Sequence, residues 1–148
     1  MAGDPRRPRI FIDADVLFAG SASPTEHSAS LVLLRMAEIT LIEAIASTQV
    51  VTEAERNLRA KIPLALPAFQ LLVSRCLREV PDPALDEIKA LTGLVDPDDA
   101  PILAAAVREN CPYLATFNVR HYQPGVKSVS AFKPGDLVQH IRYLLSEL

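Results

Sequence analysis

Acidic side chains in three separate segments of the chain could act together on one substrate. Asp13 follows the apolar run RIFI, Glu53 lies in the early turns of an expected helix, and Asp99 stands near the start of another. Together with Asp15 they would form an all-oxygen ligand set, which Mg²⁺ and Mn²⁺ prefer. Carboxylates crowded together repel one another unless a cation is bound. The sequence therefore predicts a divalent metal site, at which bound metal could activate water for phosphodiester hydrolysis.

The segment DPDDAPILAAA contains three acids, and their spacing separates them. Asp96 is expected to cap a helix, and Asp98 to complement the helix dipole in a supporting position. Apolar residues stand three, four and seven positions after Asp99, so Asp99 heads the stripe that faces the core. An inward-facing carboxylate is costly unless it is paired or binds a cation. Asp99 is therefore the metal-ligand candidate of this segment.

The other acids also have simpler interpretations. Glu53 could be an exposed helix acid that pairs with Arg56 or with Asn57, which follows one turn later. Asp13 could cap a turn after its strand, and Asp15 could be the turn residue instead. Both interpretations stay open on the residues alone.

The elements that must position these acids alternate between strands and helices. The patterns predict strands over 9–13, 41–47, 79–80, 113–118 and 126–130, and helices over 23–38, 49–62, 83–92, 97–109 and 134–148, with a further helix beginning at 64. This order indicates βαβ units and an α/β fold, with one three-layer domain over residues 1–148 whose central sheet is mostly parallel and flanked by helices. Functional groups gather at the carboxyl ends of such strands, where Asp13 and Asn118 are expected.

Length and composition favour a folded cytoplasmic protein. The chain has 148 residues, of which 49% are hydrophobic and 22% charged, and its net charge is −3. This balance excludes a disordered chain, and no apolar run approaches the roughly 20 residues of a membrane helix. No secretory signal is visible. Cys76 and Cys111 are expected to be buried free thiols, because no disulfide or zinc pattern accompanies them.

Basic side chains form local clusters, although the chain as a whole is slightly acidic. Each cluster could simply be a solvated face. If the protein binds RNA, the candidate contacts to backbone phosphates are Arg6, Arg7, Arg56, Arg59, Arg120 and Lys127. Phe117 and Tyr122 are the candidate platforms for base stacking. His27 and His140 are expected at the surface or at helix caps.

Four segments resemble the PIN domain family in order and spacing: IFIDADVLFAG, VVTEAERNL, DPDDAPILAAA and LATFNVRHY. The resemblance covers almost the whole chain. It implies a Rossmann-like sheet and a ribonuclease that depends on Mg²⁺ or Mn²⁺, with Asp13, Glu53 and Asp99 as the family's first three acids. Thr116 matches the family's strand-end Thr, and Asp15 stands where the family often has Asn. Many small bacterial members are toxins of toxin–antitoxin pairs, so the resemblance also implies a cognate antitoxin and a homodimer.

One position departs from the family pattern. The fourth acid is replaced by Asn118, and His121 fills a nearby position where relatives with Asn sometimes carry Asp. The lost charge leaves one metal supported by Asp13 and Asp99 and puts a second metal in doubt.

Two functions are compatible with the PIN resemblance. The first is a metal-dependent endoribonuclease with Asp13, Glu53, Asp99 and Asn118 as catalytic residues and Asn57 in support. The second is a catalytically weak or inactive PIN-like module that binds RNA or a protein, which the neutral Asn118 favours.

A third function belongs to another class. The motif Asp13-x-Asp15 also resembles the aspartyl nucleophile of haloacid-dehalogenase-type phosphatases. That chemistry needs a lysine near the phosphoryl group. The lysines that precede DPDDA, Lys61 and Lys89, lie in unsuitable helical contexts, so this is the lesser alternative.

Overall fold

The computed structural model describes residues 7–23 and 28–147, and its centre is a five-stranded sheet. The strand order is β3-β2-β1-β4-β5, and each neighbouring pair is parallel. The strands are β1 (Arg9–Ile12), β2 (Glu43–Ser47), β3 (Leu77–Val80), β4 (Tyr113–Ala115) and β5 (Ser130–Phe132). The predicted α/β fold with a parallel sheet is confirmed.

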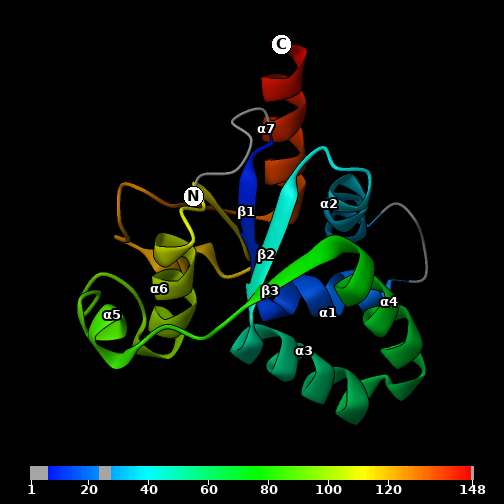
Figure 1. Ribbon diagram of the computed structural model, residues 1–148, viewed down its shortest axis with the longest axis horizontal. Coiled ribbons are helices and arrows are strands. Elements are labelled where there is room, and N and C mark those ends of the chain that lie inside the picture. Colours follow the sequence, from blue (N-terminus) through cyan, green and yellow to red (C-terminus); the bar gives the residue numbers. More distant parts are fainter. Residues whose placement is uncertain (1–6, 24–27, 148) are drawn as a thin grey trace.

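Helices cover both faces of this sheet (Figure 1). One group packs together on one side and contains α1 (Ala14–Ala22), α2 (Ala29–Glu38), α3 (Thr48–Lys61) and α4 (Leu66–Cys76), with α7 (Pro134–Ser146) against α2. The other side carries α5 (Leu85–Lys89) and α6 (Ala100–Arg108). The 3₁₀ turns are η1 (Pro63–Ala65), η2 (Pro97–Asp99) and η3 (Val119–Tyr122). Among the described helices, none combines the length and apolar character that a membrane crossing requires.

The central strand β1 is apolar because helices cover both of its faces. Ile10, Phe11 and Ile12 are fully buried, as a parallel strand between two helical layers requires. Cys76 and Cys111 are buried free thiols, as expected.

Helix α1 was missed by the sequence analysis, which placed no element between residues 13 and 23. Val16, Leu17 and Gly20 are all buried, so the helix lacks the polar face that would give it a helical pattern. Gly20 allows a close approach to α2, because a Cβ there would lie 2.8 Å from a methyl carbon of Leu34.

Several predicted boundaries also need correction. The predicted strand 126–130 is wrong, since β5 begins at Ser130, and the predicted strand 113–118 already ends at Ala115. The predicted helix 23–38 is shorter, because α2 begins at Ala29 after the cap residue Ser28. Its expected start at Pro24 lies outside the described residues.

The sheet register determines which residues meet at the carboxyl edge. Ile12 pairs with Ala115, and Ala115 with Phe132. Asp13 and Thr116, which come next in the chain, are therefore neighbours, and the Asp13 N–H donates to the Ala115 carbonyl at 3.0 Å. This edge carries the candidate site.

Candidate metal-binding active site

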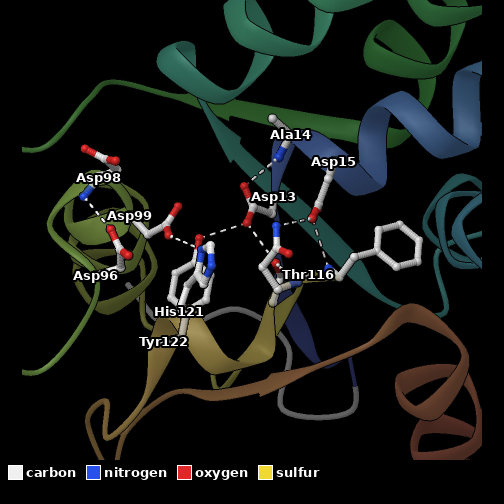
Figure 2. Close-up of polar contacts among 11 residues, drawn as sticks. Asp13, Ala14, Asp15, Asp96, Asp98, Asp99, Thr116, His121 and Tyr122 are labelled. Carbon is white, nitrogen blue, oxygen red and sulfur yellow. Dashed lines mark hydrogen bonds and ion pairs between the residues drawn. The ribbon is translucent and has the colours of Figure 1, made fainter.

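Asp13 caps the start of α1 and is held by three hydrogen-bond donors. Its Oδ1 accepts from the Ala14 N–H at 2.7 Å, and its Oδ2 accepts from the hydroxyls of Thr116 at 2.9 Å and Tyr122 at 2.8 Å (Figure 2). The residue is only 8% exposed. A buried carboxylate is tolerated when such donors surround it. The orientation of Asp13 is therefore fixed by the first N–H of α1 and by two hydroxyls from the segment that follows β4.

Tyr122 belongs to this site and is not a platform for bases, so that expectation was wrong. It is 4% exposed. Burial, followed by the charge of Asp13, raises the pKa of its hydroxyl. The hydroxyl therefore stays protonated and serves as the hydrogen-bond donor to Asp13. Nothing in the spacing indicated this contact, because 109 positions separate Tyr122 from Asp13.

Asp15 lies in the first turn of α1 and contacts the segment that follows β4. Its Oδ2 accepts from the Phe117 N–H at 3.1 Å and from Nδ2 of Asn118 at 3.3 Å. Burial, and next the charge of Asp13, raise the pKa of Asp15 to about 6. The structure thus brings Asp15 and Asn118 together, with Asp13 close enough to act on the Asp15 charge.

Glu53 on α3 and Asp99 at the end of η2 complete the acidic group. Burial raises the pKa of Glu53, and the charges of Asp13 and Asp99 raise it further, against the opposing effect of Arg56. Burial, then Asp13, also raise the pKa of Asp99. All three acids chosen from the sequence therefore lie within electrostatic reach of one another.

His121 and Asp96 extend the site beyond the residues chosen from the sequence. The His121 Nδ1 lies 3.0 Å from Oδ2 of Asp99, and the His121 carbonyl accepts from the Asp96 N–H at 2.7 Å. Ligand atoms of Asp96, Asp99 and His121 all lie within 4.8 Å of one another. Asp96 also caps η2, as expected, by accepting from the Asp98 N–H. Only the fold could reveal this group, since 22 positions separate Asp99 from His121.

Two residues expected in support lie at the margin. Asp98 is exposed, and its side chain points away from Asp13 in Figure 2. Asn57 is half-buried one turn after Glu53 on α3.

The expected basic contacts are distributed unevenly. Arg56 acts on the charge of Glu53, and Arg120 is exposed on η3, next to His121. Arg59 is engaged in an ion pair with Glu55 at 2.7 Å.

Lys127 is exposed in the loop before β5, and Arg7 is half-buried ahead of β1. Arg6 lies outside the described residues, as does His27.

His140 does not behave as a surface or cap residue. It stacks on Phe132, with ring centroids 5.3 Å apart, and its Nε2 lies 3.2 Å from the Tyr113 hydroxyl. Its role is therefore packing between α7 and the sheet.

The residues at the carboxyl edge fit a divalent cation. Burial, and next the charge of Asp13, raise the pKa of Asp15, Glu53 and Asp99, so negative charge is concentrated there. Oδ1 of Asp15 is buried and has no hydrogen-bond partner among the described residues. The side chains there offer mainly carboxylate oxygens, which hard cations prefer, and His121 adds an imidazole nitrogen within 4.8 Å of ligand atoms of Asp96 and Asp99.

Comparison with known families gives the identity of the fold. The PIN domain family matches residues 9–120, which is most of the chain. The chain belongs to the PIN domain family. No curated protein matches it.

Several solved structures share this architecture. PAE2754 from Pyrobaculum aerophilum has a TM-score of 0.65 and 17% identity, covering 95% of this chain and 99% of that one. VapBC2 from Rickettsia felis, solved with a DNA fragment from its promoter, has a TM-score of 0.64 and 14% identity, covering 84% and 98%. VapC20 from Mycobacterium tuberculosis, described as a toxin that cleaves the sarcin-ricin loop, has a TM-score of 0.54 and 15% identity, covering 80% and 97%. At these identities the likeness concerns the fold.

Proposed function

We propose that this PIN domain protein is a metal-dependent endoribonuclease that hydrolyses RNA phosphodiester bonds. The observation that carries the proposal is the proximity of Asp13, Glu53 and Asp99 at the carboxyl edge of the sheet, where burial and then the charge of Asp13 raise the pKa of Glu53 and of Asp99. Membership of the PIN domain family favours this function over a haloacid-dehalogenase-type phosphatase.

In this proposal Asp13, Glu53 and Asp99 hold Mg²⁺ or Mn²⁺, and Asn118 contributes an uncharged polar group beside them. The cation would supply Lewis-acid stabilisation of the phosphodiester and a lowered pKa of water. Thr116 and Tyr122 hold the Asp13 carboxylate in one orientation through their hydroxyls. The His121 ring positions Asp99 through the contact between its Nδ1 and Oδ2 of Asp99. The protein thus contributes a preorganised set of charges and no side-chain nucleophile.

RNA would approach through backbone-phosphate contacts. Arg56 and Arg120 are the best placed of the expected basic residues, because both are exposed and adjoin the acids. Arg59 and Lys127 would contact phosphates farther along the strand. Phe117, which is 45% exposed next to Asn118, is the remaining candidate for stacking on a base.

The proposed setting is a toxin–antitoxin pair. The fold is shared with VapBC2 and with the toxin VapC20. We therefore propose a cognate antitoxin as protein partner, a homodimer as the active form, and the cytoplasm as the location, since RNA and an antitoxin would both be found there. We further propose that residues 1–148 act as one domain without a membrane partner.

Cleavage of RNA by the purified protein tests this function. With Mn²⁺ the protein should cut single-stranded or structured RNA, and EDTA should stop it. Asp13→Asn and Asp99→Asn should each lose about 100-fold or more of the rate, because each removes a ligand charge. Asp86→Asn, on the exposed surface of α5, is the matched control and should retain the rate. Equal cleavage by all four proteins would refute the assignment.

A non-catalytic PIN-like module that binds RNA or a protein is the second candidate. The neutral Asn118 favours it, since it leaves one charge fewer near the acids. In that case calorimetry would detect no Mn²⁺ binding tighter than the millimolar range, while RNA or a protein partner would still bind.

A further inference from the structure

The two oxygens of the Asp15 carboxylate have different surroundings. Oδ2 accepts two hydrogen bonds, from the Phe117 N–H at 3.1 Å and from Nδ2 of Asn118 at 3.3 Å. Oδ1 is buried and has no hydrogen-bond partner in the described part of the chain. A buried acceptor without a partner is costly, and either a hydrogen-bond donor or a cation would satisfy this oxygen.

The charges that act on Asp15 do not supply such a cation. The nearby charged groups that act on it include Asp13 and Asp99, and both are negative. Figure 2 shows Asp15 beside Asp13, at the start of α1. A cation held by Asp13 and Asp99 would therefore also offset the charge of Asp15.

The contact between Asp15 and Asn118 also limits how much charge this pair can carry. The Asn118 amide donates through Nδ2, so it can meet an ionised Asp15 without repulsion. A carboxylate at position 118 would place a second negative charge at the same short distance from Asp15, which is unfavourable. The pair is thus suited to one negative charge, and in this chain the charge lies on residue 15.

We propose that Asp15 supplies to the metal the negative charge that Asn118 cannot carry, while Asn118 and the Phe117 N–H hold Asp15 in position. The proposal rests on the metal site of the proposed function and identifies its fourth charged residue. Asn118 is then a positioning residue, and its lack of charge does not disable the site.

Exchange of the two residues tests the proposal through metal binding alone. Mn²⁺ affinity would be measured by calorimetry and by electron paramagnetic resonance on the full chain, in the wild type, Asp15→Asn, Asn118→Asp and the double variant Asp15→Asn/Asn118→Asp. Asp15→Asn should weaken Mn²⁺ binding about 10-fold or more, and the double variant should regain most of that loss. Cleavage of RNA should follow the same order.

The results separate this proposal from the proposed function. Unchanged Mn²⁺ affinity in Asp15→Asn, or a double variant as weak as Asp15→Asn, would overturn the role of Asp15 while leaving the metal site intact. No Mn²⁺ binding by the wild type would instead reject the metal site itself. Circular dichroism of every variant checks folding, and Asp15→Ser serves as a second charge-removing variant with the same expected loss if Asp15→Asn does not fold.

Discussion

The acidic residues at the two ends of the sheet differ in whether basic side chains neutralise them. At the amino end, Glu43 lies 2.9 Å from Arg78 and 3.4 Å from Arg9, and Glu109 lies 2.9 Å from Arg108 and 3.2 Å from Arg78. At the carboxyl end, Asp13 and Asp15 accept hydrogen bonds from uncharged N–H and O–H groups instead, and Asp99 lies 3.0 Å from His121.

This difference separates carboxylates that are paired within the fold from carboxylates that remain available to the proposed cation. At the amino end, arginine guanidinium groups form ion pairs with both Glu43 and Glu109. The carboxyl end has His121 beside Asp99 and Arg56 near Glu53, but burial and the neighbouring acids still leave the pKa of both carboxylates raised. We infer that the buried negative charge at the carboxyl end lowers the free energy of unfolding of the metal-free protein and favours binding of a cation.

The largest expected effect is stabilisation by metal. Mn²⁺ at 100 times its dissociation constant should add about 2.7 kcal/mol to the free energy of unfolding. In a thermal melt this corresponds to a rise in Tm of roughly 5–10 °C for a chain of this size. Asp13→Asn should show no such rise. A wild-type Tm that does not respond to Mn²⁺ would remove the distinction between the two ends.

Removal of one acid at each end should have opposite effects on the free energy of unfolding, measured in EDTA. Glu109→Gln leaves two arginines without their shared partner and should lower the free energy of unfolding by about 1–2 kcal/mol in denaturant melts. Glu53→Gln relieves repulsion and should raise it by up to about 0.5 kcal/mol after solvent screening. Glu38→Gln, which breaks only the exposed pair with Arg35, is the control and should change it by less than about 0.5 kcal/mol. Losses of equal size at both ends would contradict the comparison.

The pH dependence of apo stability should reveal the raised pKa of Asp15. Its pKa is about 6 in the folded protein, against 3.8 ordinarily. Well below pH 3.8 both states hold the proton, so its contribution is fully present. As the pH rises towards and through 6, the unfolded chain releases the proton first and stability falls, by about 1 kcal/mol after screening. Denaturant melts from pH 4 to 8 should show this fall in the wild type relative to Asp15→Asn, and parallel curves would disprove it.

The smallest expected effect concerns RNA affinity. Arg120→Ala should weaken RNA binding a few-fold and reduce the slope of log affinity against log salt by about 1, because one phosphate contact is lost. Arg35→Ala, on the exposed face of α2, is the control for general charge loss. Fluorescence anisotropy at several salt concentrations, in EDTA to prevent cleavage, measures both. An unchanged slope for Arg120→Ala would exclude a phosphate contact there.

Much of the fold could be predicted from local pattern, and the exceptions have a physical cause. Strand β1 was recognised from its continuous apolar run, and helices α3 and α7 were recognised from apolar periodicity, which reflects burial on one face. Helix α1 was missed because neighbours surround it, so its sequence shows no polar stripe. The end of β4 was placed three residues too late because Thr116, Phe117 and Asn118 leave the sheet to contact Asp13 and Asp15, which local propensity does not encode.

The sequence by itself determined which residues could do chemistry. Acids that follow a buried strand or begin a helix can be recognised because their neighbours in the chain are apolar. Only the tertiary structure decided how they are held. Tyr122 donates to Asp13 and Asn118 to Asp15 across more than 100 positions, and His121 reaches Asp99 from another loop. Such hydrogen bonds depend on strand register and loop path, which are set by packing of the whole chain. They produce no periodic pattern in the sequence, so local analysis of the residues does not predict them.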